Sequence, residues 1–367
     1  MKTQYSNAQI ILALRKYPNV GFTTGRKLLS AVNYDAQRLV DLNLADFEET
    51  EGISAKFLEE WNLLPYLEQA EEQLEQARAN GDLILTIADE KYPQKLKHLP
   101  DAPFALFVRG NVEALNLNKS IAVVGTRNIT DYGKQVCQKL CAELVASGIG
   151  IISGLAFGVD AWAHHTTLQN GGLTGAVLGH GLQLIYPYQN KKLAQRIIDH
   201  GGFVLSEYDY GTAPDRQNFP TRNRIVAGMT DATLVIETGI KGGSMVTASF
   251  AQQYNKDVFV VPGRITDEYS LGCLELLKHD LARPVSSVGD ILDEMAWKKM
   301  EPNSPRQLSM IIPDKFKSVY HQLEKPVNID DLCVKSGKKL SELNALLIEM
   351  ELEGWVQILP GKKVARM

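Results

Sequence analysis

Short apolar runs alternate with amphipathic stretches between Leu83 and about Ala296. Continuous apolar runs are typical of strands buried on both faces, and the periodic segments between them of crossover helices. The pattern therefore predicts a doubly wound, mostly parallel α/β sheet, which would bind ligands beyond the carboxyl ends of its strands. The predicted strands are Ile121-Ala-Val-Val, Gly150-Ile-Ile, Thr174-Gly-Ala-Val-Leu, Gly202-Phe-Val-Leu, Ala232-Thr-Leu-Val-Ile and Asp257-Val-Phe-Val-Val.

Residues 1–85 have helical spacing and predict a separate all-helical domain. Two glycine turns, one around Gly21 and Gly25 and one at Glu51-Gly-Ile-Ser, each resemble half of a helix-hairpin-helix, whose turn amides can bond a DNA phosphate. The alternative is that these glycines cap helices with a positive φ angle. The predicted helices are Ala8 to Tyr17, Thr24 to Val32, Leu44 to Phe47, Ser54 to Trp61 and Leu64 to Asn80.

Residues 301–367 predict a winged helix, which leaves residues 86–300 for the sheet domain. A polar, proline-containing linker precedes three helical segments, and a hairpin follows them that turns at Pro360-Gly361. Several glutamates on the third helix, among them Glu342 and Glu349, favour a protein contact or an accessory role over duplex DNA. The predicted helices are Asp314 to Leu323, Ile329 to Ser336 and Leu340 to Glu353.

The composition is that of an ordinary globular protein. The 367 residues include 39 Lys and Arg against 43 Asp and Glu, a net charge of −4, which excludes a protein that coats nucleic acid by its overall charge. Any anion site must therefore be local. The amino terminus has no apolar signal core, no long apolar run is present, and the four cysteines form no C-x-x-C pair. We expect a cytoplasmic protein with no membrane contact and no metal site.

Glycines and cations follow the first two predicted strands. Gly125 permits a sharp turn after the first strand, and Arg127 offers a planar cation suited to bidentate phosphate contact. After the second strand come Ser153 and Gly154, and the helix that follows would present free N–H groups to an anion. The turn at Ser153 and Gly154 therefore predicts an anion-binding site.

Two further loops repeat this chemistry. The segment that begins at Asn218 places two guanidinium groups, an amide and a flat ring at the start of a helix, and a lysine with a glycine pair follows the fifth strand. For any one loop a tight turn with a solvated cation is the simpler interpretation, but the recurrence at strand ends favours a ligand. The candidate residues are Phe219, Arg222, Asn223, Arg224, Lys241, Gly242, Gly243 and Ser244.

Signals for catalysis are weak. Asp160 and His164 lie four apart on a predicted helix, but with no nucleophile or second carboxylate nearby we expect Asp160 to cap the helix and His164 to pack. The chain has no Walker A motif, no G-x-G-x-x-G after the first strand and no nucleophile elbow. We expect no catalytic residue and no cofactor.

Taken together, these motifs resemble the DNA processing protein A (DprA/Smf) family. The resemblance implies an extended Rossmann fold between a sterile-alpha-motif-like (SAM-like) helical domain and a winged helix. Two departures stand in the segment after Gly272, where Leu274 replaces a typical asparagine and Asp280 a typical glycine. The matching motifs are Val-Gly-Thr-Arg at 124–127, Ser-Gly-Leu-Ala-Phe-Gly-Val-Asp at 153–160, Phe-Pro-Thr-Arg-Asn-Arg-Ile-Val-Ala-Gly at 219–228, Gly-Gly-Ser at 242–244 and Val-Phe-Val-Val-Pro-Gly at 258–263.

The resemblance also implies a function without bond-making. Members of the family bind and protect incoming single-stranded DNA in natural transformation, help load the RecA recombinase and form homodimers through the Rossmann domain. A first rival is a phosphoribohydrolase-like Rossmann enzyme, but Ser249 stands where its glutamate would be. A second rival is a regulator that binds duplex DNA through the winged helix. We expect tolerance of sequence, because base edges would go largely unread.

Overall fold

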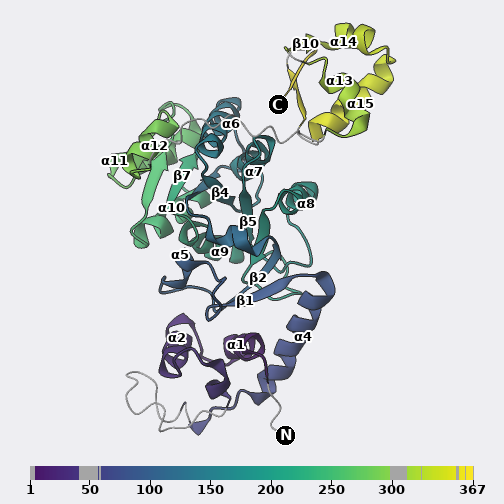
Figure 1. Ribbon diagram of the computed structural model, residues 1–367. Helices are drawn as coiled ribbons and strands as arrows, with labels where there is room; N and C mark the ends of the chain where they lie inside the picture. Colours follow the sequence, from purple (N-terminus) through teal and green to yellow (C-terminus); the bar gives the residue numbers. More distant parts are fainter. Residues whose placement is uncertain are drawn as a thin grey trace. The chain divides into compact units, whose positions relative to one another are not determined.

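A computed structural model describes residues 5–40, 57, 59–297, 312–323, 325–352, 355–359 and 361–366. The chain divides into two compact units, residues 1–305 and residues 306–367 (Figure 1). No helix in the described ranges combines the length and apolar character needed to cross a membrane.

In its described part, the first unit is built on a nine-stranded sheet in the order β1-β2-β6-β5-β4-β3-β7-β8-β9. The strands from β3 to β9 pair in parallel, whereas β1 and β2 add an antiparallel pair beside β6. The six strands predicted from apolar runs are confirmed; the antiparallel pair and the short β9 were not predicted. The strands are β1 (Leu83–Thr86), β2 (Ala105–Gly110), β3 (Ser120–Gly125), β4 (Gly150–Ser153), β5 (Thr174–Leu178), β6 (Phe203–Ser206), β7 (Ala232–Ile236), β8 (Asp257–Val260) and β9 (Arg283–Pro284).

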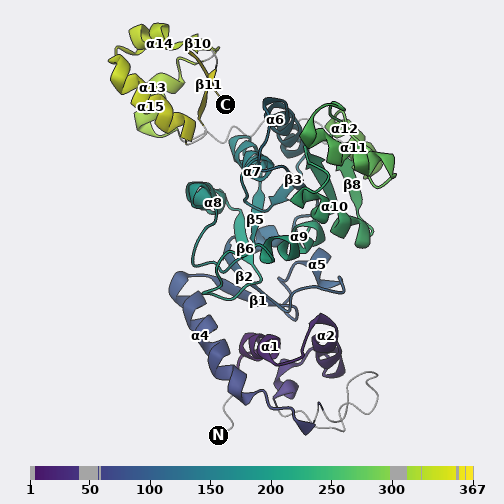
Figure 2. The same cartoon turned by 180° about the vertical axis from the view of Figure 1, so that it is seen from behind.

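Helices cover both faces of this sheet (Figure 1, Figure 2). On β3, Ile121 and Val123 join the hydrophobic cluster of α6, α7 and α12, whereas Ala122 and Val124 join the cluster that includes α9 and α10. Burial on both sides explains why the strand sequences are continuously apolar. The helices of this layer are α5 (Gln94–Lys97), η3 (Val112–Asn116), α6 (Asp131–Ala146), α7 (Val159–Gln169), η4 (Tyr188–Asn190), α8 (Lys191–Asp199), α9 (Asn218–Gly228), α10 (Gly243–Gln253), η5 (Glu268–Ser270), α11 (Leu271–Lys278) and α12 (Val288–Glu294).

The amino-terminal helices share the larger hydrophobic cluster with β1 and β2. Gly21 caps α2 with a φ of −88°, so it supplies no positive φ, and Gly25 lies inside α2, where an added Cβ would meet the Phe104 ring at 2.5 Å. Of the second predicted glycine turn, residues 51–56 lie outside the described ranges, as does the predicted helix at 44–47. The described elements are α1 (Asn7–Lys16), α2 (Phe22–Ala31), η1 (Ala36–Leu39) and α4 (Leu64–Asn80).

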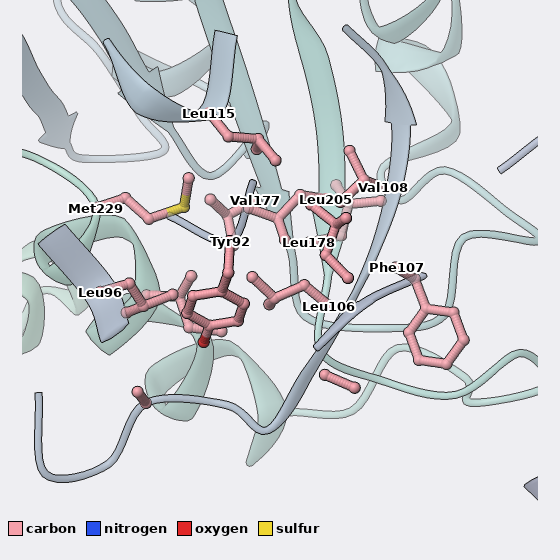
Figure 3. Packing of buried hydrophobic residues seen from close by; sticks show 14 of the residues in the cluster. Tyr92, Leu96, Leu106, Phe107, Val108, Leu115, Val177, Leu178, Leu205 and Met229 are labelled. Carbon is pink, nitrogen blue, oxygen red and sulfur yellow. The ribbon is translucent and has the colours of Figure 1, made fainter. Parts of the chain in front are cut away.

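Tyr92 is central to the packing between the segment before β2 and the sheet. Figure 3 shows its ring among Leu96, Leu106 and Val177, and its hydroxyl donates to the carbonyl of Pro103 at 2.6 Å. Full burial of one such side chain is worth about 1.5–3 kcal/mol, and pairing the hydroxyl avoids the cost of a buried unsatisfied donor. This packing ties the antiparallel strands to the parallel sheet that carries the cleft described below.

The second unit is a winged helix, as predicted. Its three helices and the antiparallel sheet β10-β12-β11 enclose a core of their own that includes Phe316, Leu332, Leu347 and Val364. The short strand β10 was not predicted. The elements are α13 (Asp314–Tyr320), β10 (Val327–Asn328), α14 (Ile329–Ser336), α15 (Leu340–Leu352), β11 (Val356–Leu359) and β12 (Lys363–Arg366).

Candidate nucleic-acid interface

A cleft of about 1040 Å³ opens at the carboxyl ends of the parallel strands. Its walls are the segments that follow β3, β4, β5, β6, β7 and β8, together with α9. Strand β3 pairs with β4 on one side and with β7 on the other, so the connections that leave the ends of β3 and β7 cross to opposite faces of the sheet. Open α/β sheets bind ligands at the position where the strand order reverses in this way. The volume lies just above the roughly 300–1000 Å³ usual for small-molecule sites.

The cleft brings together ten of the twelve residues predicted to bind the ligand. The two that do not line it are Ser153, whose buried hydroxyl donates to the carbonyl of Val123 at 2.7 Å, and Arg224. The ten lining residues are Gly125, Arg127, Gly154, Phe219, Arg222, Asn223, Lys241, Gly242, Gly243 and Ser244.

Positive charge dominates the open part of the cleft. Arg127, Arg216 and Lys241 are exposed, and none of them makes an ion pair with another residue in the described part of the chain. Against them stands one exposed carboxylate, Glu268. Three cations gathered in one concave surface raise the local concentration of an anionic ligand even though the whole chain is acidic.

Arg222 is a fixed cation in the floor of the cleft. It is 4% exposed, and its guanidinium donates to the carbonyls of Gly154 (2.7 Å) and Val177 and to the amide oxygen of Asn223 (3.1 Å). Burial lowers its pKa to about 10, while the charge of Asp160 works against that shift, so it stays protonated at neutral pH. Arg222 therefore joins strand ends, and its contribution to a bound phosphate is limited by burial.

Arg224 belongs to a different surface of α9, and the prediction that it shares the cleft with Arg222 finds no support in the geometry. Residues two apart on a helix do not face the same side. Arg224 is 3% exposed, forms an ion pair with Glu207, and its guanidinium carbon lies 4.8 Å from the centroid of the Phe22 ring. It joins α9 to α2 and to the segment after β6.

The predicted anion site at Ser153 and Gly154 is filled by the chain's own carboxylate. A side-chain oxygen of Asp160 accepts hydrogen bonds from the backbone N–H groups of Gly154 (3.2 Å) and Ala156 (3.3 Å). Burial raises the pKa of Asp160, and the charge of Arg222 and the two backbone bonds lower it. Gly154 itself is needed for space, because an added Cβ would lie 2.4 Å from the guanidinium of Arg222.

A second carboxylate occupies the start of α6. Glu237, which follows β7, accepts hydrogen bonds from the N–H (2.9 Å) and the hydroxyl of Thr130, the cap of that helix. Its backbone carbonyl accepts from the N–H of Thr126 at 2.7 Å. Glu237 thus holds both ends of the loop that carries Arg127.

At α10 the glycine turn leaves the first amides facing the cleft. Gly242 caps the helix, and the N–H groups of Gly243 and Ser244, as first-turn donors, have no intrahelical acceptor. The Ser244 hydroxyl is turned inward and donates to Thr238 at 2.6 Å, and the Asn223 side chain donates to the carbonyl of Gly243 at 3.2 Å. The backbone of this turn, with Lys241 at its entrance, can therefore hold an anion.

Aromatic rings flank the cations. Phe219 stacks on Tyr186 with centroids 5.8 Å apart and planes at 28°, and the guanidinium carbon of Arg127 lies 5.5 Å from the Phe219 centroid. Tyr186, Arg216 and Tyr269 line the cleft without having been predicted. Tyr186 and Arg216 lie in loops and Tyr269 lies in the short helix η5, and none of these segments has a periodic pattern. The sequence signal is limited to an aromatic or basic residue in a segment that follows a strand.

Asp160 and His164 do not form an acid–base pair. The His164 ring is fully buried and bonds the hydroxyl of Thr174 at 2.6 Å, and burial lowers its pKa to about 3, so it is neutral. His164 therefore packs inside the fold, as the sequence favoured. Asp160 does not cap α7 as expected, because its carboxylate accepts from the amides of Gly154 and Ala156 in the loop before the helix, and the helix begins after Gly158 without a side-chain cap. Within the described ranges, no three His, Cys, Asp or Glu side chains gather as a metal site would require.

Comparison with known proteins identifies the family. The family model described as DNA recombination-mediator protein A matches residues 83–296, and the DprA winged helix domain matches residues 322–362. The chain is 33% identical to Protein Smf of Synechocystis sp. over 87% of this chain and 88% of that protein. It is 41% identical to DNA processing protein DprA of Streptococcus pneumoniae over 58% of this chain and 74% of that protein.

Two solved structures are similar. DprA from Streptococcus pneumoniae matches with a TM-score of 0.66 and 33% identity over 80% of this chain and 99% of that one. DNA processing protein A from Helicobacter pylori, reported for its single-stranded DNA binding mode, matches with a TM-score of 0.53 and 32% identity over 59% of this chain and 95% of that one. The protein therefore belongs to the DNA processing protein A (DprA/Smf) family.

Proposed function

We propose that the cleft binds single-stranded DNA and that the protein is a recombination mediator, which protects incoming strands in natural transformation and helps load RecA. The observation that carries the proposal is the placement of exposed cations beside stacked aromatic rings, with Arg127 lying over Phe219 and Phe219 stacked on Tyr186. The single-stranded DNA binding mode of the Helicobacter pylori relative supports it.

Each part of a DNA strand has a matching group in the cleft. Arg127, Arg216 and Lys241 would bind successive phosphates, and the free amides at the start of α10 would bind another. Tyr186 and Phe219 would stack against bases. Every base has a flat face, so stacking and phosphate contacts together bind without strong sequence preference.

Single strands fit this chemistry better than duplexes do. A base can stack on a ring beside the cleft only if it leaves its own stack and partner, which costs a few kcal/mol in a duplex and far less in a single strand. A homodimer would join two clefts and increase affinity through avidity. Dimer formation, the RecA partnership and action in the cytoplasm are expectations that rest on membership in the family.

The test is a titration of a fluorescein-labelled thymidine oligomer, alone or annealed to its complement. Wild-type protein should bind the single strand more tightly, and an Arg127→Ala/Lys241→Ala variant should lose affinity equally for thymidine and mixed-sequence strands. Arg127→Lys should lose less than Arg127→Ala, because it keeps the charge and loses the planar fork. Lys139→Ala, at an exposed position of α6 outside the cleft, is the control.

Equal affinity for single strand and duplex, abolished by deletion of residues 301–367, would instead assign DNA binding to the winged helix. Release of free base from nucleoside monophosphates would refute a binding function and favour the phosphoribohydrolase alternative. Light scattering with and without the oligomer measures the dimer, and RecA nucleation on the bound strand measures the partnership.

A further inference from the structure

Beyond the rim of the cleft, the chain continues through a basic and aromatic segment. Tyr186 is the last cleft-lining residue on this side, and Tyr188 follows it with 76% of its surface exposed. The Lys191 ammonium lies 6.0 Å from the centroid of the Tyr188 ring. Residues 181–198 contain no Asp or Glu, whereas Lys191, Lys192 and Arg196 are basic.

This outer segment is rigidly attached to the cleft wall. Asn190 is buried, and its side-chain amide donates to the carbonyls of Leu155 (2.9 Å) and Ala156 (3.2 Å), of which Ala156 itself lines the cleft. Behind it, α8 contacts β5 and β6 through buried side chains that include Leu193 and Ile197. The segment therefore keeps a fixed place beside the cleft rather than following a loose loop.

Packing inside the protein does not explain why an aromatic residue stands at position 188. A tyrosine ring that is 76% exposed contributes little to the core, and its contact with Lys191 is a weak surface cation–π contact. A ring has two faces, so a base can stack on Tyr188 while the ammonium stays near. Aromatic rings interleaved with cations are the arrangement by which proteins follow a single strand.

We propose that Tyr188 and Lys191 form an outer DNA subsite, which takes one nucleotide of a strand that leaves the cleft across Tyr186. The base stacks on the Tyr188 ring, and the phosphate contacts the Lys191 ammonium. The inference rests on the proposed function, because it needs a strand in the cleft. It assigns the direction in which the bound strand extends and makes the site longer than the cleft itself.

The test compares oligomer lengths. Thymidine oligomers of about four and about sixteen nucleotides, which span the range of known single-strand site sizes, are titrated against wild type and Tyr188→Ala/Lys191→Ala. The variant should bind the long oligomer about tenfold more weakly, as expected for the loss of one stacked base and one phosphate contact. Its affinity for the short oligomer, which fills the cleft alone, should not change.

Tyr188→Phe keeps the ring and should bind both oligomers as wild type does. A 2-aminopurine base moved along the long oligomer should be quenched by wild-type protein at a position near one end, and that quenching should disappear in Tyr188→Ala. The inference is overturned if the double variant loses no affinity for the long oligomer, or loses it equally for both lengths. Failure of wild-type protein to bind either oligomer would instead refute the proposed function and the subsite with it.

Discussion

Replacing Arg222 with alanine should weaken folding before it weakens DNA binding. The guanidinium is 4% exposed and joins the ends of two parallel strands through the carbonyls of Gly154 and Val177. Its removal leaves both carbonyls without that donor and leaves the buried carboxylate of Asp160 without the cation that lowers its pKa. The sequence alone had presented Arg222 as a phosphate ligand, so the two interpretations give different results.

The magnitude follows from the buried acceptors that lose their donor. Leaving a buried acceptor unsatisfied costs about 1–3 kcal/mol, and Arg222 donates to two such carbonyls. A domain has about 5–15 kcal/mol of stability in total. Arg222→Ala should therefore retain its fold with a clearly lowered urea midpoint, and Arg216→Ala, which removes an exposed cation of the same cleft, should change stability by no more than about 0.5 kcal/mol.

The assay is urea unfolding followed by circular dichroism. Because the chain has two compact units, hydrogen exchange of peptides from β4 and β5 assigns the loss to the first unit. The deficit should also depend on pH. In the variant the Asp160 pKa rises further, so the native state takes up a proton more readily than the unfolded chain as pH falls, and the stability gap to wild type narrows toward acidic pH.

The reasoning is refuted if Arg222→Ala unfolds at the wild-type midpoint and loses DNA affinity with a shallower salt slope. That result would mean that the guanidinium reaches solvent and binds phosphate directly. A stability deficit that does not change with pH would separately reject the electrostatic influence of Arg222 on the pKa of Asp160.

Three further predictions test other parts of the structure. Gly154→Ala should lower the free energy of unfolding by about 1–3 kcal/mol, measured by heat or urea, because the added Cβ displaces the buried guanidinium of Arg222. Gly243→Ala is the control and should not destabilise the protein, because a Cβ there would have no atom within 4 Å. Equal losses of stability in the two variants would contradict the packing of Arg222 against Gly154. The stability of the wild type relative to His164→Gln should fall by up to about 1.4 kcal/mol per pH unit as pH drops from about 6.5 toward 3. The reason is that His164 takes up a proton in this range in the unfolded chain but stays neutral when it is buried. An unchanged stability difference between the two proteins across this range would show that His164 titrates normally. Arg224→Ala should lower stability through its pair with Glu207 yet leave the salt slope of DNA binding unchanged, and a shallower slope would place Arg224 in the DNA path.

The sequence predicted the parallel sheet because strands buried on both faces must be continuously apolar. It did not identify β1 and β2. Strand β1 forms the edge of the sheet, where Leu83 is 50% exposed and continuous apolar character is not required. Strand β2 lies inside the sheet, and its apolar run Ala105 to Val108 is buried, so this strand carried the same signal as the parallel ones and was missed. At Asp280 the sequence did indicate a feature of the backbone. The family resemblance marked this residue as a departure from glycine, and its backbone has the left-handed φ of 55° that a glycine would adopt more easily.

For the cleft, the sequence identified the loops but not the direction of each side chain. Helical geometry could have separated Arg222 from Arg224, since both lie on α9 two residues apart. The sequence suggested that Asp160 accepts backbone N–H groups at the start of α7 but not that these would be the loop amides of Gly154 and Ala156, which the sequence had offered to an external anion. Tyr186 lies in a loop whose path is set by the fold as a whole.

The central claim is that exposed cations at the carboxyl ends of the strands hold the phosphates of a single strand. It is tested most directly by the salt dependence of binding of a thymidine oligomer to wild type and to Arg127→Ala/Lys241→Ala. Each phosphate contact contributes about 0.7 to the slope of log affinity against log salt for single strands, so the double variant should have a slope shallower by about 1.4. A slope equal to that of wild type would show that the strand binds elsewhere and would contradict the account.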